Sequence, residues 1–125
     1  MSNERRVSNA DDVRRIALSL PETTAKPSYG TPGFRVRDRL FARIREEGDV
    51  LVVWADDAER AALMAERPGT FFTTPHYGRH RLVLVRFADV SREELTELLT
   101  ESWRLRAPGR LAAAFPVADP DACDD

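Results

Sequence analysis

Arginines recur between apolar residues in the segment YGTPGFRVRDRLFARI, residues 29–44. They stand at Arg35, Arg37, Arg39 and Arg43. A guanidinium group donates two parallel hydrogen bonds to a phosphate, so arginines gathered on one face of a sheet could bind an anion such as the backbone of nucleic acid. The alternative is the solvated face of an ordinary sheet. Lys26 is the single lysine of the chain, and such a preference for arginine is typical of GC-rich coding.

The direction of these side chains depends on the turn between two predicted strands. Alternation in the first strand points Arg35 and Arg37 away from the core. A two-residue turn at 38–39 would then point Arg43 inward, whereas a turn of odd length would leave Arg43 and Arg45 on the open face. The core face of the second strand would in that case carry Leu40, Ala42 and Ile44. We expect the odd-length turn, with Arg86 as a further neighbour on the open face.

A second cluster lies in the segment PHYGRHR, residues 75–81. Tyr77 lies between basic groups, with Arg79 and Arg81 following it, and an exposed ring in such a setting suits stacking on a base or a sugar. The alternative is a hairpin tip with Tyr77 packed on the sheet. The two histidines of the segment are four residues apart, but its proline and glycine oppose a helix, and no acid or cysteine nearby completes a metal site. We expect no metal.

A third candidate is the loop 26–32, which contains Tyr29 and Gly30. Beside Phe34 and Trp54 this loop could line a groove, or it could simply cover the edge of the sheet. Patterns typical of catalysis are missing from the sequence: no serine stands in a GxSxG setting, and the glycines are scattered rather than gathered in a phosphate loop. Three pairs of adjacent acids stand where a helix is expected to begin: Asp11–Asp12, Asp56–Asp57 and Glu93–Glu94. We therefore expect no enzyme and no cofactor.

The spacing of apolar residues predicts the elements in order. A helix over 9–20 has Asn9 or Ser8 as its cap and ends at Pro21, and residues 21–32 read as a loop. Strands follow at 34–37, 40–45 and 50–54, then a helix at 56–66, strands at 70–74 and 81–87, and a helix at 92–106 that begins with the capping box Ser91–Glu94. One short turn is expected at 110–115.

This order, αβββαββα, predicts a single α+β domain with a five-stranded antiparallel sheet and helices packed on one face. We expect a flexible leader at 1–8, the domain at 9–115 and a disordered acidic tail at 116–125. The chain of 125 residues is 42% apolar and 32% charged with a net charge of −2, which is a globular composition without the strongly basic total of many nucleic-acid-binding domains. One cysteine and no apolar core in the N-terminal segment predict a cytoplasmic protein.

Three segments together resemble the MmcQ/YjbR family: SLPETT at 19–24, YGTPGFRVRDRLFARI at 29–44 and ERPGTFFTTPHYGRHRLVLV at 66–85. The Gly-Lys turn that is usual in the family is Asp38–Arg39 here. The resemblance implies a double-wing-like α+β fold, similar in architecture to type III secretion chaperones and frataxin-like domains. It also implies DNA binding, a label that the family owes to its fold. In this arrangement the 37–40 turn and the 75–81 loop would be the wings.

The sequence therefore predicts a small non-enzymatic protein that binds DNA without sequence preference through an arginine-rich sheet face and its wing loops. The alternatives are a chaperone-like protein-interaction module and a binder of a small anionic ligand on the same face. The expected partner is DNA or an unidentified protein, without a membrane, and the expected state is a monomer or weak dimer. The binding residues would be Arg35, Arg37, Arg39, Arg43, Tyr77, Arg79 and Arg81.

Overall fold

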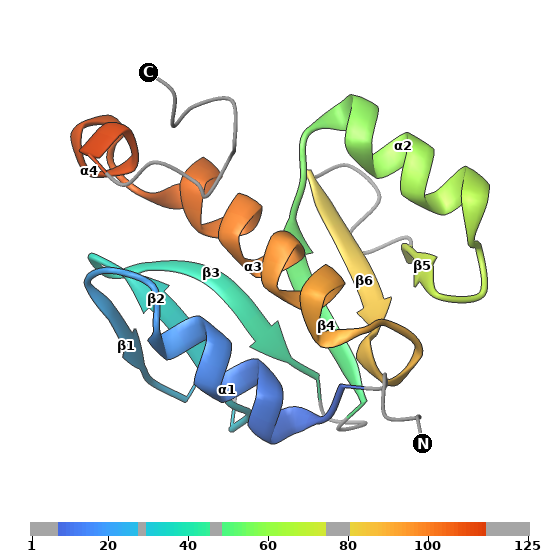
Figure 1. Cartoon of the computed structure of the whole chain (residues 1–125), viewed down its shortest axis with the longest axis horizontal. Coiled ribbons are helices and arrows are strands. Elements are labelled where there is room, and N and C mark those ends of the chain that lie inside the picture. The colour runs from blue at the N-terminus through green and yellow to red at the C-terminus, as the bar shows by residue number, and fades with distance from the viewer. Residues whose placement is uncertain (1–7, 28–29, 46–48, 75–80, 115–125) are drawn as a thin grey trace.

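A six-stranded antiparallel sheet forms the centre of the protein, with the strands in the order β1-β2-β3-β4-β6-β5 (Figure 1). The computed structural model describes residues 8–27, 30–45, 49–74 and 81–114. The strands are β1 (Thr23–Ala25), β2 (Gly33–Val36), β3 (Arg39–Ile44), β4 (Val50–Trp54), β5 (Phe71–Phe72) and β6 (Leu82–Arg86). The helices are α1 (Ala10–Leu18), α2 (Asp57–Glu66), α3 (Arg92–Arg106) and α4 (Gly109–Ala114), with a short 3-10 turn, η2 (Phe87–Asp89). The α+β class is confirmed.

The sheet has one strand more than the sequence predicted, because β1 lies in the segment expected to be a loop. Its three residues pair with β2, with Thr23 opposite Val36. A run this short between prolines shows no alternation of apolar and polar residues. The strand forms because the edge of β2 offers unpaired backbone groups, and such groups must find partners when they are buried.

The helices pack against one face of the sheet, as predicted. Val13 and Ala17 of α1 and Leu99 and Trp103 of α3 are fully buried against it. The helix α2 has no buried residue and meets the core only through partly buried side chains such as Leu63. We call this face the helix face and the opposite one the open face.

Two neighbouring strands, β4 and β6, are apolar on both faces. Val50 and Val52 of β4 and Leu82 and Leu84 of β6 form a second cluster on the open face, and their exposed fractions lie between 0 and 7%. A strand buried on both faces reads as a continuous apolar run rather than an alternating one. The uninterrupted sequence VLVVW of β4 therefore reflects its central place in the sheet.

The turn between β2 and β3 corrects the predicted register. Val36 pairs with Arg39, so the turn has two residues, Arg37 and Asp38, with φ of 48° and 71°. Two positive φ angles suit the right-handed twist of a hairpin. The expected odd-length turn is wrong, but an irregularity in the pairing restores the phase: Arg35 pairs with Leu40 while Phe34 pairs with Ala42.

Because of this bulge, two neighbouring residues of β3, Phe41 and Ala42, both enter the core, and Ile44 follows them there. Arg43, which pairs with Gly33 and Val52, lies on the open face as expected. Leu40 was expected on the core face, but its pairing with Arg35 places it on the open face. A bulge adds one residue to one strand, and no turn rule predicts it from the sequence.

A buried serine of α3 stands where β3 and β4 separate. The ladder between these strands ends at the pair Ala42–Val53. The Ser102 hydroxyl accepts a hydrogen bond from the Trp54 N–H (2.8 Å) and donates one to the Phe41 carbonyl (2.5 Å). The hydroxyl thus replaces a direct backbone bond between the two strands. Its side chain is completely buried.

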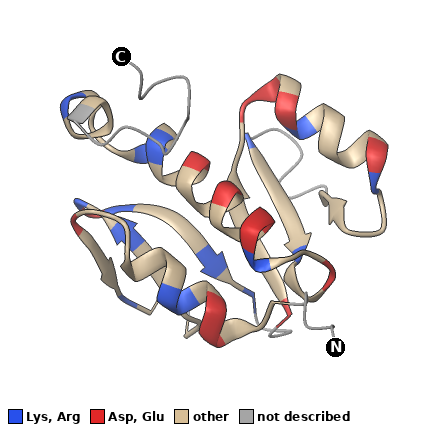
Figure 2. Cartoon of the chain, viewed as in Figure 1, with Lys and Arg blue, Asp and Glu red and all other residues tan. Residues whose placement is uncertain are grey.

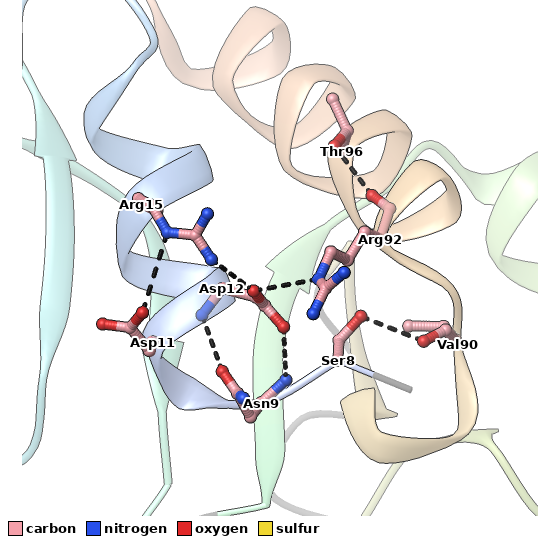
Figure 3. A network of polar contacts seen from close by, with 8 residues as sticks. All are labelled: Ser8, Asn9, Asp11, Asp12, Arg15, Val90, Arg92 and Thr96. Carbon is pink, nitrogen blue, oxygen red and sulfur yellow. Dashed lines mark hydrogen bonds and ion pairs between the residues drawn. The ribbon is translucent and has the colours of Figure 1, made fainter. Parts of the chain in front are cut away.

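A polar network joins the starts of α1 and α3 (Figure 3). Asn9 and Asp12 form a capping box, and the Asp12 carboxylate also accepts hydrogen bonds from Arg15 (2.6 Å) and Arg92 (3.1 Å). Next to it, the Ser8 hydroxyl donates to the Val90 carbonyl at 2.9 Å. Burial raises the pKa of Asp12, but the hydrogen bonds from Asn9 and Arg92 outweigh this effect and leave the pKa below its usual value.

Replacing Ser102 by alanine should destabilise the fold strongly. The Trp54 N–H and the Phe41 carbonyl would each lose a partner in a buried place, at a cost of about 2–4 kcal/mol in total. Urea unfolding of the Ser102→Ala variant measures this loss. Ser19→Ala is the control, because its exposed hydroxyl bonds only within its own helix turn, and it should change the free energy of unfolding by less than about 0.5 kcal/mol. Equal effects of the two variants would contradict the bridging role.

The Asp12 network should make stability depend on pH in acid. Because the pKa of Asp12 is lower in the folded than in the unfolded state, its contribution is complete above about pH 4 and is lost as the pH falls through the folded value. The free energy of unfolding of the wild type should therefore fall more steeply below about pH 4 than that of Asp12→Asn. Asp11→Asn, which alters an exposed carboxylate, should keep the wild-type profile. Parallel profiles for wild type and Asp12→Asn would refute the assignment.

Candidate nucleic-acid interface

Two of the predicted arginines lie on the open face of the sheet. Arg35 extends from β2 and Arg43 from β3, and both are half-buried. The guanidinium of Arg43 donates to the Thr31 hydroxyl at 3.0 Å, and that of Arg35 to the Asp38 carbonyl at 3.2 Å. Arg86 of β6 is on the same face, as expected, because it pairs with Val50. Its guanidinium lies over the Phe72 ring, 4.8 Å from the centroid.

The other predicted residues are placed differently. Arg37 lies in the turn rather than on a strand, and both its Nε and one terminal nitrogen donate to the Glu22 carboxylate. This ion pair raises the pKa of Arg37 and lowers that of Glu22. Arg81 precedes β6 and lies 3.9 Å from Asp57. Tyr77 and Arg79 are outside the described residues, as are both histidines.

Arg39 meets the end of α3, a contact that the sequence does not predict. Its guanidinium donates to the carbonyl of Arg106 at 3.2 Å, and Arg106 in turn donates to the Leu40 carbonyl at 2.9 Å. The Arg106 guanidinium also lies over the Trp54 ring, 4.5 Å from the centroid. Burial lowers the pKa of Arg106, and the nearby charge of Arg39 adds to this effect. Two like charges therefore stand side by side here.

Charge is unevenly distributed over the molecule, although α1 and α3 each carry both signs (Figure 2). The β2–β3 hairpin, the last turn of α3 and the first turn of α4 carry arginines, and Asp38 is the one acid within these segments. Between residues 49 and 101, by contrast, described acids outnumber described arginines. We call the first group the basic surface. It comprises Arg35, Arg37, Arg39, Arg43, Arg45, Arg104, Arg106 and Arg110.

Three members of this surface were not predicted from the sequence: Arg104, Arg106 and Arg110. A local signal existed, because arginines in the last turn of the 92–106 helix oppose the negative end of the helix dipole. That signal explains a helix end and says nothing of a neighbour across the fold. The proximity of Arg106 to Arg39 arises only when α3 packs over the hairpin.

The predicted groove at the loop 26–32 exists in part. A cavity of about 430 Å³ is lined by Lys26, Gly30 and Phe34, but Trp54, expected beside it, stands instead under Arg106. Tyr29 is outside the described residues. Within the described ranges, no three histidine, cysteine or acidic side chains gather as a metal site would require. Among the same residues, no helix has the length and hydropathy needed to cross a bilayer.

The arrangement of a bulged antiparallel sheet with α1 and α3 on one face is matched by known proteins. A family model described as YjbR matches residues 18–105. The chain belongs to the YjbR family. This finding confirms the resemblance noted in the three sequence segments.

Relatives of this YjbR protein occur in mycobacteria. Proteins named as uncharacterized in Mycobacterium tuberculosis and Mycobacterium bovis are 35% identical over 123 residues, covering 84% of this chain and 93% of theirs. A crystal structure of a Deinococcus radiodurans protein with the family-model domain DUF419 superposes with a TM-score of 0.68 at 22% identity, covering 93% of this chain and 88% of that one. This last likeness supports the fold alone.

Proposed function

We propose that this YjbR protein binds the phosphate backbone of DNA without sequence preference, and that it acts by binding rather than by catalysis. The observation that carries the proposal is the contact between Arg39 and Arg106, which joins the arginines of the hairpin to those of the α3 and α4 ends. The basic surface thus includes residues of both segments, on a chain whose net charge is only −2. Such a separation of charge is what contact with a polyanion requires.

The chemistry of the surface suits phosphate better than bases. Guanidinium groups bind phosphate oxygens through paired hydrogen bonds, and contacts of this kind carry no information about sequence. Several of these arginines already use one donor within the protein, as Arg35 and Arg43 do. A guanidinium has five N–H donors, so others remain for a phosphate. We therefore expect similar affinity for duplexes of different sequence.

The weak net charge sets the expected strength. Because the acidic end of the molecule repels the same polyanion, binding should depend on a few direct contacts and fall steeply as salt screens them. A dissociation constant of about 10⁻⁴–10⁻⁶ M at physiological salt is typical of non-specific binding. The two alternatives that the sequence leaves open are a chaperone-like protein-interaction module and a binder of a small anionic ligand on the same face.

The double variant Arg39→Gln/Arg110→Gln tests the proposal. Fluorescence anisotropy of a labelled duplex, titrated at several salt concentrations between about 50 and 200 mM, gives the slope of log K against log[salt]. Losing two phosphate contacts should reduce the magnitude of the slope by about 2 and weaken binding of all duplexes alike. Neither residue lies in the core, so folding should persist. Arg35 and Arg37 suit the test less well, since one is half-buried and the other pairs with Glu22.

The matched control is Ala61→Glu/Ala62→Glu on exposed positions of α2. This variant changes the net charge by the same amount as the arginine variant, but at the acidic end. Its salt slope should remain that of the wild type. If both variants lose the same affinity, overall charge and not the basic surface determines binding. If the wild type fails to bind even at low salt, the proposal is wrong, and an acidic protein partner becomes the better hypothesis.

A further inference from the structure

A cavity lies between α1 and residues 25–27 and 30–34, beside β2 on the helix face. Its volume is about 430 Å³, and Arg14, Lys26, Pro27 and Phe34 are among the residues that line it. A smaller cavity of about 250 Å³ adjoins it and shares Arg14 and Phe34. The larger volume falls within the range of pockets that hold small molecules.

The two cations of this cavity have no charged partner in the described part of the chain. The side chains of Arg14 and Lys26 form no hydrogen bond or ion pair there, unlike most arginines of this protein. No acid among the described residues lines the larger cavity. Asp11 lines the smaller one, but its carboxylate lies 3.6 Å from Arg15. Two cations around one hollow without a counter-charge attract an anion.

Most of the remaining lining is apolar, and part of it is held in place by hydrogen bonds. Phe34 belongs to the core and is 1% exposed, so its ring provides a fixed apolar floor, and prolines form part of the walls. The wall that contains Thr31 and Pro32 is tied to β3 twice. The Arg43 guanidinium donates to the Thr31 hydroxyl, and the Ile44 N–H donates to the Pro32 carbonyl at 2.9 Å. A pocket tied in this way needs little ordering when a ligand enters.

We propose that this cavity binds a small organic anion, with a carboxylate or phosphate group at Arg14 and Lys26 and an apolar body against Phe34 and the prolines. The site is separate from the basic surface, because neither cation belongs to it. The two sites also differ in the kind of ligand that they suit. The basic surface offers arginines to an extended polyanion, whereas this half-open cavity has a volume suited to one small molecule.

Nuclear magnetic resonance titration of the ¹⁵N-labelled protein tests the proposal. The probes are benzoate and phenyl phosphate, which combine an oxyanion with a ring, and benzyl alcohol and inorganic phosphate, which each lack one part. The two combined probes should shift the amides of Ala25, Lys26 and residues 33–34 in a saturable manner. We expect dissociation constants of about 1 mM or tighter for ligands of this size. Whichever combined probe binds more tightly identifies the oxyanion.

The variant Arg14→Gln/Lys26→Gln should weaken the binding of both combined probes at least about tenfold, since it removes the charged hydrogen-bond donors. Its dispersed amide spectrum reports whether the fold is intact. Ala61→Glu/Ala62→Glu, with the same change in net charge, should bind as the wild type does. Three results would overturn the proposal: shifts outside the cavity, equal affinity in the Arg14→Gln/Lys26→Gln variant, or binding of benzyl alcohol or inorganic phosphate as tight as that of the combined probes.

Discussion

The Ser102 hydroxyl is the contact on which much of this fold depends. Where β3 and β4 separate, a backbone N–H and a carbonyl lose each other as partners, and buried backbone groups rarely remain unpaired. The hydroxyl satisfies both groups at once. Since serine has a short side chain, α3 must lie close to the gap between the strands. The depth of α3 at this point of the sheet therefore follows from a single residue.

The residue after Ser102 links α3 to the N-terminal part of the chain. Trp103 is fully buried, and its indole N–H donates to the Pro21 carbonyl at 3.0 Å, just after the end of α1. At the other end of α3, Arg92 binds Asp12 at the start of α1. The helix α3 is thus joined to the N-terminal segment near both ends, and to the sheet through Ser102, next to Trp103. By contrast, α2 buries no residue and depends on partly buried contacts.

This position of α3 also creates the charge pattern of the surface. The helix ends over the β2–β3 hairpin, which brings Arg106 against the Leu40 carbonyl and the Trp54 ring and beside Arg39. A helix C-terminus favours cations because its free carbonyl groups carry partial negative charge. The hairpin carries arginines of its own, Arg35, Arg37 and Arg39. The basic surface is therefore the meeting of two local preferences that lie far apart in the sequence.

The sequence by itself determined the helices, most strand positions and the family. Caps at Asn9, Asp56 and Ser91 and the spacing of apolar residues are local signals, read within one or two turns. The open-face position of Arg43 was also predicted, although the predicted turn was wrong and a bulge restored the phase. Only the tertiary structure decided the strand β1, the bulge, the bridge made by Ser102, the pairing of Arg39 with Arg106 and the cavity at Arg14 and Lys26. Each of these depends on segments distant in sequence that must satisfy one another's backbone groups or enclose a shared space, and no local pattern of residue types specifies such contacts.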